Sequence, residues 1–268
     1  MYKRQAIRYS SHLRFAFFET KREKSNATKV TIFAPNYAKN STALVTRSQS
    51  VFLEGAQKEA EILESLFPSK AFIGKTATKE NFVNYKSEGN ILHMAMHASI
   101  DKDNPGFSHF DFSNGEKLFL EELYALKIPA DLAVLSACNT AVGKEDGSLS
   151  IRSLQRAFNY AGTTATIASL WEVPDEATSK IMIGFYEYLK DGKSKSKALQ
   201  QAKIDYLNTT DITTLKHPYY WAGFILYGED IPVVSQNMKS IWIVLQFILI
   251  IAVICLILFK RRKVKLIE

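Results

Sequence analysis

The chain has 268 residues, 47% of them hydrophobic, and a formal net charge of +7 at pH 7. This length and apolar fraction are sufficient for a folded domain with a sizeable core, which excludes a disordered tail. Residues 1–29 carry eight Lys and Arg against two Glu, and residues 260–268 carry five against one, whereas the middle of the chain is slightly acidic. Because a nucleic-acid-binding domain gathers basic residues on its folded part, we expect no nucleic-acid partner.

The middle of the chain alternates predicted strands with predicted helices, as judged from hydrophobic periodicity and from Gly and Pro at the boundaries. The predicted strands are 29–35, 71–77, 90–98, 131–138, 164–171 and 221–228. The predicted helices are 54–67, 78–89, 120–126, 148–161, 175–192 and 195–207. Residues 110–120 form a predicted hairpin about Asn114 and Gly115. This alternation predicts an α/β fold with a mostly parallel sheet and helices on both faces.

The last part of the chain contains a long apolar segment. Residues 241–259 include no charged residue, and Gln246 is their only strongly polar member. A helix of this length spans about 28 Å, close to the thickness of a bilayer core. We therefore predict a linker at 230–240, a single-pass transmembrane helix at 241–259 and a basic tail at 260–268, with lipid as a partner. Cys255 lies inside the helix, and we expect no disulfide between it and Cys138.

The charges beside the predicted span give its orientation only in part. Lys239 precedes it and five Lys and Arg follow it, so the positive-inside rule favours a cytoplasmic tail. The N-terminus, however, has no secretory signal, because its apolar positions are interrupted and no small-residue cleavage site follows. Two alternatives stay open for the side of the domain: a tail-anchored protein with a cytoplasmic domain, or a chain whose upstream signal and further domains are absent from this sequence.

Two residues with nucleophile and base chemistry end neighbouring predicted strands. His97 ends one strand and Cys138 ends another, and the carboxyl ends of parallel strands meet at one edge of a sheet. An imidazole within reach of a thiol activates it, so the pair is a candidate catalytic dyad; the alternative is that both are core residues. His93 is four residues before His97, but on a strand that separation is about 13 Å, too far to share a metal ion. We interpret His93 as a core or lining residue on the same face and predict no metal.

Four segments together resemble a known family: ILHMAMHA, LAVLSACNTAVG, the stretch from LQRAFNYAG to YEYLKDG, and HPYYWAGFILYG. In this order they are similar to the CHAT domain, a caspase-like domain related to separases and other clan CD cysteine peptidases and often found with tetratricopeptide repeats. The resemblance implies a caspase-like three-layer fold over residues 29–229. It also implies that His97 is the general base and acid, that Cys138 is the nucleophile, and that the N–H groups of Ala98 and Cys138 form the oxyanion hole.

The sequence departs from the family pattern at three places. Ala98 stands where the family usually has Gly; alanine keeps the N–H but resists positive φ. Asn139 stands where the residue after the cysteine is commonly acidic. Residues 1–28, which include AIRYSSHLRFAF, resemble the middle rather than the beginning of the family's first segment, and we interpret them as the remainder of a truncated region.

The loop after the strand at 164–171 carries candidate specificity residues. Related peptidases often bind a basic substrate residue with a buried carboxylate, so Asp175 and Glu172 are candidates for substrate binding. The alternative, which we favour for Asp175, is a helix cap beside Glu176. We interpret the aromatic residues near this loop as packing residues rather than a ligand site. They are Trp171, Tyr219, Tyr220 and Trp221.

The sequence thus predicts a membrane-anchored, caspase-like cysteine endopeptidase that needs no cofactor and cleaves a protein substrate in signalling or regulation, with a tetratricopeptide-repeat region upstream or in a partner. The alternative is a catalytically inactive CHAT scaffold that acts through protein contacts. A nucleotide-binding α/β domain is disfavoured, because no Gly-rich phosphate loop follows any predicted strand.

Overall fold

The computed structural model describes residues 6–9, 28–36, 54–86, 89–101, 104–136, 147–171 and 173–234. Within these ranges, seven strands form one sheet in the order β1-β10-β9-β8-β4-β2-β3. They are β1 (Arg8–Tyr9), β2 (Val30–Ala34), β3 (Ser69–Ile73), β4 (Ile91–Met94), β8 (Leu132–Leu135), β9 (Ala165–Ser169) and β10 (Phe224–Gly228). Neighbouring strands are parallel, except that β10 is antiparallel to β9. The predicted mostly parallel sheet is therefore confirmed.

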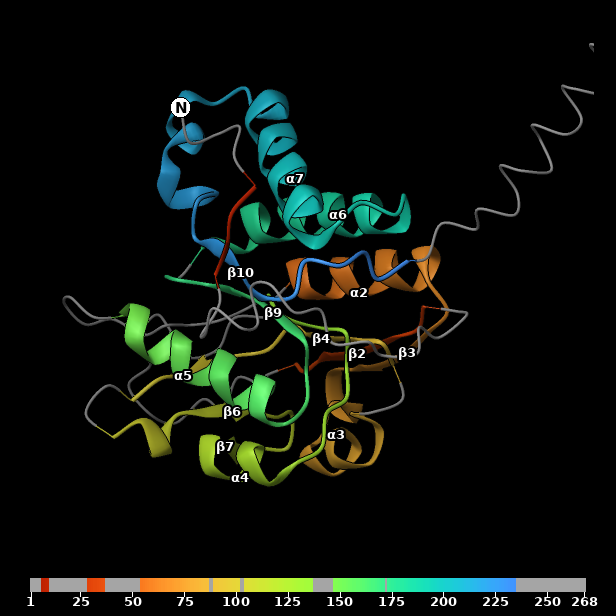
Figure 1. Ribbon diagram of the computed structural model, residues 1–268, viewed down its shortest axis with the longest axis vertical. Helices are drawn as coiled ribbons and strands as arrows, with labels where there is room; N and C mark the ends of the chain where they lie inside the picture. The colour runs from red at the N-terminus through yellow and green to blue at the C-terminus, as the bar shows by residue number, and fades with distance from the viewer. Residues whose placement is uncertain are drawn as a thin grey trace, which may run out of the picture. The chain divides into compact units, whose positions relative to one another are not determined.

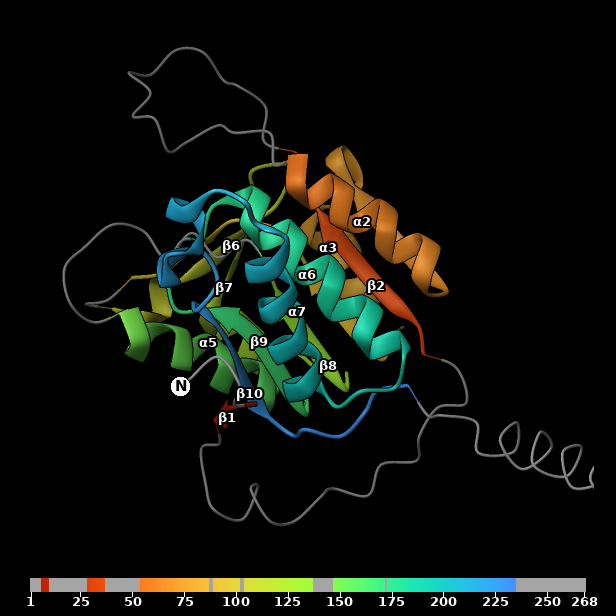
Figure 2. The same ribbon diagram turned by 90° about the horizontal axis from the view of Figure 1, so that it is seen from above.

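Helices cover both faces of this sheet (Figure 1). One face carries α2 (Glu54–Leu66), α6 (Asp175–Lys190) and α7 (Lys195–Thr209), which run side by side in the view from above (Figure 2). The other face carries α3 (Lys79–Tyr85), α4 (Leu120–Ala125), α5 (Gly147–Tyr160) and a small antiparallel sheet. The small sheet consists of β5 (Ala98–Ser99), β6 (His109–Asp111) and β7 (Lys117–Phe119). The result is a three-layer α/β fold.

Four single-turn 3-10 helices complete the described elements. They are η2 (Gly74–Thr76), η3 (Pro105–Phe107), η4 (Thr213–Lys216) and η5 (Pro218–Tyr220). The last two lie between α7 and β10, and they bring the chain back to the edge of the main sheet.

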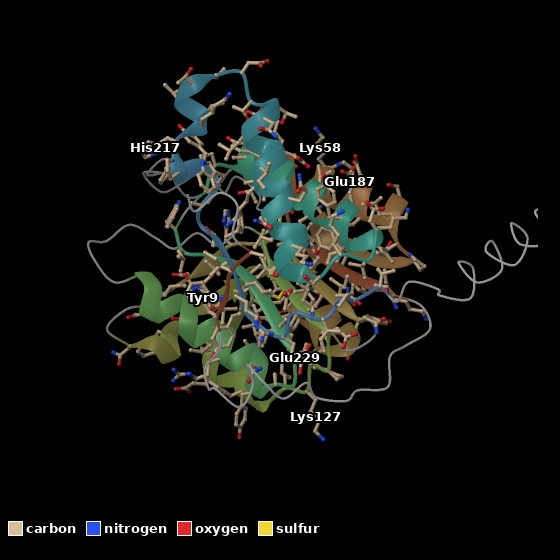
Figure 3. The ribbon with its side chains drawn as sticks, turned by 45° about the horizontal axis from the view of Figure 1, so that its top comes forward. Tyr9, Lys58, Lys127, Glu187, His217 and Glu229 are labelled. Atoms are coloured by element: carbon tan, nitrogen blue, oxygen red, sulfur yellow. The ribbon has the colours of Figure 1, made fainter. Side chains whose placement is uncertain are left out.

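Hydrophobic alternation along the strands divides the core into two clusters. In β4, Ile91 packs toward α2 and α6, whereas Leu92 and Met94 pack toward the opposite face. The helix α2 shows the matching 3.6-residue period, since Ala60 and Leu63 are buried while Lys58 is exposed. Figure 3 shows Lys58 and Glu187 on the outer side of this helical layer.

Local sequence signals locate several element boundaries correctly. The Thr78 hydroxyl accepts a hydrogen bond from the Asn81 N–H at 3.2 Å, which is the predicted cap at the start of α3. The predicted hairpin lies between β6 and β7, and Gly115 has a φ of 80°, a conformation that favours glycine. Both predictions are confirmed.

The sheet differs from the sequence prediction at several strands. β4 ends at Met94 instead of residue 98, so His97 follows the strand rather than ending it, and Ala98 begins β5 of the small sheet. β3 begins at Ser69 instead of residue 71 and gives way to a 3-10 helix at Gly74. β10 is antiparallel, because two helices and two 3-10 turns separate it from β9 and return the chain from the opposite end of the sheet. β1 was not predicted at all; two residues are too few for a period to appear, and Arg8 pairs with Leu226 at the sheet edge.

The predicted membrane span at 241–259 and the basic tail lie outside the described residues. Among the helices that the structure describes, we find none with the length and apolar character needed to cross a bilayer. Membrane anchoring through the C-terminal segment therefore stays a prediction from the sequence.

Candidate functional site

The carboxyl ends of β4 and β8 define the candidate site. These strands are adjacent and parallel, with Ile91 opposite Leu132 and Met94 opposite Leu135. The Ser136 N–H donates to the Met94 carbonyl at 3.2 Å, which extends the pairing beyond β8. His97 lies three residues after Met94, and Cys138 lies three residues after Leu135 in the sequence. The two residues therefore follow paired strand ends by the same number of positions in the sequence, and Cys138 and Asn139 lie outside the described residues.

His97 lies where the chain passes from the main sheet to the small sheet. It follows the buried residues Ala95 and Met96 and is itself half-buried. Its carbonyl accepts a hydrogen bond from the Asp111 N–H at 3.0 Å, which ties the backbone at this position to β6. The backbone at His97 is therefore held to the small sheet, while the residue keeps partial exposure at the edge where ligands bind in this class of fold.

Ala98 is the first residue of β5, the edge strand of the small sheet. It lies opposite Phe110 in an antiparallel ladder, in which successive residues direct their N–H groups alternately toward and away from the partner strand. Because the neighbouring Asp111 N–H donates to His97, the Ala98 N–H points away from β6. The extended backbone of a strand is compatible with alanine, so the glycine usual in the family is not required here for a positive φ.

The Asp175 side chain forms a hydrogen bond with α2 instead of the expected cap on its own helix. It is the first residue of α6, and the N-cap of that helix is Pro174, which offers no side-chain hydrogen bond. The Asp175 carboxylate instead accepts a hydrogen bond from the Gly55 N–H at 2.7 Å, in the first turn of α2. The predicted cap beside Glu176 is therefore wrong: the close packing of α2 against α6 brings an unsatisfied N–H of the neighbouring helix within reach. Glu172, the other candidate for substrate binding, lies outside the described residues.

His93 belongs to a buried polar cluster that the sequence analysis did not identify. Its Nδ1 lies 2.9 Å from Tyr186 Oη, and its Nε2 lies 3.1 Å from Glu59 Oε2 without the alignment of a hydrogen bond. All three side chains are at most 1% exposed. Burial raises the pKa of Tyr186 well above its usual value, and the nearby charge of Glu59 contributes in the same direction.

The interpretation of His93 as a core residue is confirmed. Among the described residues, no group of three His, Cys, Asp or Glu side chains is arranged to hold a metal ion. A sequence signal for the cluster did exist, because Glu59 interrupts the apolar stripe of α2 next to Ala60. A carboxylate on a buried helix face needs a partner, and His93 is that partner.

The aromatic residues after β9 and before β10 pack together. The Trp171 indole N–H donates to the Tyr219 carbonyl at 2.7 Å, which joins the loop after β9 to the segment before β10. Tyr220 and Trp221 are partly buried against the core. Tyr219, in contrast, is 45% exposed, and Trp221 also lines a cavity. Packing as the sole role of these four residues therefore stays a prediction.

Comparison with known proteins extends this description. The family model of the CHAT domain matches residues 1–229. Tetratricopeptide repeat protein 28 from Homo sapiens is 28% identical over 225 residues, which cover 69% of this chain and 9% of that protein. The Mus musculus protein of the same name is 26% identical over the same shares, so the chain spans about a tenth of the length of the curated relatives it matches.

A solved structure shares the fold. The Arg-specific cysteine proteinase gingipain R superposes with a TM-score of 0.53 over 78% of this chain and 49% of that chain. The sequence identity is 10%, so this match shows a common caspase-like α/β architecture alone.

Proposed function

Because this chain belongs to the CHAT domain family, we propose that it is a caspase-like cysteine endopeptidase in which His97 and Cys138 form the catalytic dyad. The observation that supports this proposal is the register of β4 and β8: His97 and Cys138 each follow a paired residue, Met94 and Leu135, by three positions in the sequence. Adjacent strands lie about 4.8 Å apart, so we expect the two side chains to come within contact distance. The proposed substrate is a protein, cleaved in signalling or regulation.

In the proposed mechanism, the His97 imidazole accepts the thiol proton and Cys138 Sγ attacks the carbonyl carbon of the scissile peptide bond. The N–H groups of Ala98 and Cys138 stabilise the oxyanion of the tetrahedral intermediate. The direction of the Ala98 N–H, away from β6, supports this assignment. The protonated imidazole then donates its proton to the leaving amine, and water hydrolyses the resulting thioester.

The first test is alkylation of Cys138 by iodoacetamide between pH 5 and pH 9. The full chain with Cys255→Ala leaves Cys138 as the single thiol. We expect rapid alkylation below the ordinary thiol pKa of about 8.5, and a loss of at least about tenfold in rate at pH 7 with His97→Ala. His109→Ala is the matched control and leaves the rate unchanged, since His109 lies in β6 beside Asp111.

Slow alkylation that His97→Ala does not alter would contradict the dyad. It would favour the second candidate, an inactive CHAT scaffold that acts through protein contacts. Both curated relatives are named tetratricopeptide repeat protein 28. This supports a tetratricopeptide-repeat region as the partner of the domain, whether the domain is an active peptidase or an inactive scaffold.

Cleavage of a peptide library provides the second test. Cys138→Ala is expected to abolish cleavage without lowering the thermal unfolding midpoint, and cleavage that survives the substitution rejects the assignment. A preference for a basic residue before the scissile bond, weakened by Asp175→Asn or by Glu172→Gln, would support the proposed substrate-binding carboxylates.

We also propose that residues 241–259 anchor the protein in a membrane. This proposal is supported by the sequence, because residues 241–259 include no charged residue and a helix of this length matches the thickness of a bilayer core. The full chain is expected to stay in the membrane pellet after alkaline carbonate extraction, whereas Leu249→Arg with Val253→Arg releases it. Extraction of the unaltered chain would reject the anchor, and protease accessibility of the domain in sealed vesicles reports its side.

A further inference from the structure

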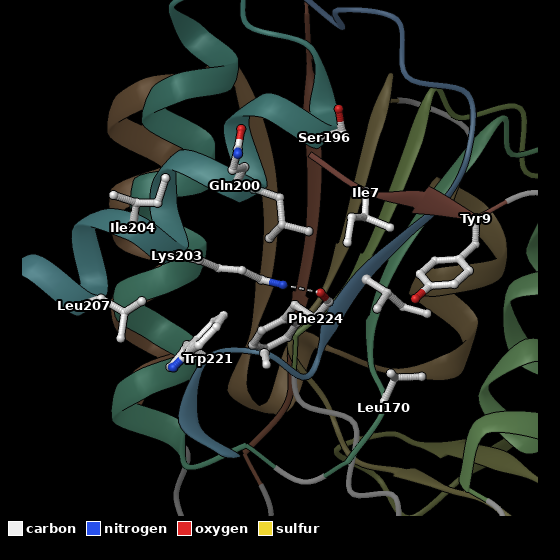
Figure 4. Close-up of a pocket in the computed structure, with 13 residues that line it drawn as sticks. Ile7, Tyr9, Leu170, Ser196, Gln200, Lys203, Ile204, Leu207, Trp221 and Phe224 are labelled. Carbon is white, nitrogen blue, oxygen red and sulfur yellow. Dashed lines mark hydrogen bonds between the residues drawn. The ribbon is translucent and has the colours of Figure 1, made fainter. Parts of the chain in front are cut away.

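A cavity of about 200 Å³ lies between α7 and the outer edge of the main sheet (Figure 4). Its walls include Leu199 and Leu207 from α7, and Trp221 and Phe224 from β10 and the turn before it. An engineered cavity of about 150 Å³ holds benzene, so this space accommodates a ligand of roughly eight non-hydrogen atoms. The exposed side chains of Ile7 and Tyr9 form part of its boundary, which makes it accessible from solvent.

One amine enters this mostly apolar space. The Lys203 side chain extends from α7, and its Nζ donates to the Phe224 carbonyl at 2.6 Å (Figure 4). Of the residues that line the cavity, none is acidic. Asp205, two residues along α7, is occupied by the Tyr188 hydroxyl and by the amide of Gln201. Among the described residues, the Lys203 amine thus donates its hydrogen bond to a neutral carbonyl.

This environment is unfavourable for a charged amine. Burial lowers the pKa of Lys203 to about 8. An ammonium group has three N–H donors, and burial of a cation without a counter-charge costs free energy. The second titratable group among the lining residues is Tyr9, which is 43% exposed and belongs to β1. No lining residue of β10 is titratable, so none of the described residues that line the cavity carries a charge opposite to that of Lys203.

We propose that this cavity is a binding site for a small monocarboxylate with an apolar body of about five to seven carbons. The carboxylate accepts hydrogen bonds from Lys203 Nζ, and the hydrocarbon part packs against Leu199, Leu207 and Phe224. A purely apolar ligand would leave the Lys203 amine without an anion. A small inorganic anion would leave the apolar walls in contact with water. A carboxylate with a hydrocarbon chain satisfies both the amine and the walls. Binding does not require the proposed peptidase activity, so its failure leaves that proposal unaffected.

Isothermal titration of the full chain with hexanoate at pH 7 tests the site. Lys203→Met is expected to weaken binding by roughly ten- to a hundredfold, which is the effect of removing a charge-assisted hydrogen bond. Lys197→Met, an exposed lysine on the same helix, is the matched control and leaves the affinity unchanged. All titrations use the same solubilising medium, so any uptake of hexanoate by the medium is equal for the unaltered protein and for both variants.

Two further probes separate the apolar and the ionic parts. Hexanol has the same chain without the carboxylate, and acetate or inorganic phosphate has the charge without the chain; each is expected to bind at least about tenfold more weakly than hexanoate. Equal binding of hexanol would overturn the role of Lys203. Equal binding of acetate or phosphate would mean an adventitious anion only, and would overturn the site as proposed.

Proton linkage gives a measurement that a purely structural lysine does not produce. At pH 8.5 the amine is mostly neutral in the unliganded protein, and a bound carboxylate favours its protonated form. Titrations in buffers of different ionisation enthalpy should therefore show uptake of roughly three-quarters of a proton at pH 8.5 and almost none at pH 6.5. Hexanoate binding with no proton uptake at pH 8.5, or equal uptake in Lys203→Met, would reject contact between the carboxylate and this amine.

Discussion

The two faces of the main sheet differ in how their cores are built. The face under α3, α4 and α5 is packed with aromatic rings that contact one another in stacked and edge-to-face geometry. These rings belong to Phe33, Phe72, Phe82, Phe110, Phe112 and Phe158. The face under α2, α6 and α7 also contains buried aromatic rings, among them Phe67, Phe185 and Phe224, but it differs in enclosing the Glu59, His93 and Tyr186 cluster. The partly buried amine of Lys203 belongs to the same helical layer.

The buried titratable side chains of the described core thus gather on one face of the main sheet, the face under α2, α6 and α7, which we call the polar face. We call the opposite face the aromatic face. The alternation in β4 directs Ile91 and His93 to the polar face, and Ala95, directly after the strand, packs on the same side. The aromatic face has no buried ion pair among the described residues, so it contributes mainly through packing, although it also buries the Gln155 amide. On the other face, the buried His93 side chain contacts both Glu59 and Tyr186, which makes this face more sensitive to single substitutions.

The largest effect should follow from breaking the aromatic face. Phe82 is fully buried in α3, with ring centroids 5.3 Å from Phe33 and 5.7 Å from Phe112. Phe82→Ala is expected to lower the free energy of unfolding by about 3–5 kcal/mol, through lost transfer energy and a cavity. Chemical denaturation measures this loss. Val83→Ala, at the exposed neighbouring position, should change stability by less than about 0.5 kcal/mol, and equal effects at both positions would refute the buried aromatic core.

The second effect concerns the polar cluster. His93→Leu leaves the Glu59 carboxylate buried without its partner and should cost about 3 kcal/mol in the free energy of unfolding. Glu59→Leu combined with His93→Leu removes both polar groups, and should recover all but about 1 kcal/mol of that loss. A double-mutant cycle in denaturant gives the coupling. Additive losses from the two substitutions would show that the pair does not interact.

The third effect has the opposite sign. The pKa of Lys203 is lowered to about 8 in the folded protein, against an ordinary value near 10.5, so the unfolded chain binds more protons between these values and stability rises with pH there. Below pH 8 the burial of the ammonium opposes folding in full. Lys203→Met should therefore stabilise the protein by about 2 kcal/mol at pH 7, and the gain should shrink as pH rises from 8 toward 10.5. A gain that is independent of pH would contradict burial of the charge as its cause.

The comparison between faces also shows what could be predicted from the sequence. The strands β4 and β8 could be predicted because, apart from His93, every residue in them is apolar. The meeting of His97 and Cys138 beyond these strands stays a prediction. The position of Glu59 in the apolar stripe of α2 signals a buried carboxylate, but its pairing with His93 was not predictable. Glu59 and Tyr186 are 34 and 93 residues from His93 in the chain and meet it only when α2 and α6 pack on the sheet. Lys203 had no signal either, because an amphipathic lysine on a helix is ordinarily solvated.

The smallest effect tests the contact that joins two helices of the polar face. Asp175→Ala removes the acceptor of the Gly55 N–H and should cost about 1 kcal/mol, as the loss of a helix N-cap does. A Cβ at Gly55 would lie 2.5 Å from Asp175 Oδ1, so Gly55→Ala displaces the carboxylate in the unaltered protein but not in Asp175→Ala. Gly55→Ala should thus cost less when Asp175 is already alanine, and a double-mutant cycle of unfolding free energies measures this coupling. Additive losses would mean that Asp175 does not hold α2 against α6, and substrate binding would then be the one proposed role of its carboxylate.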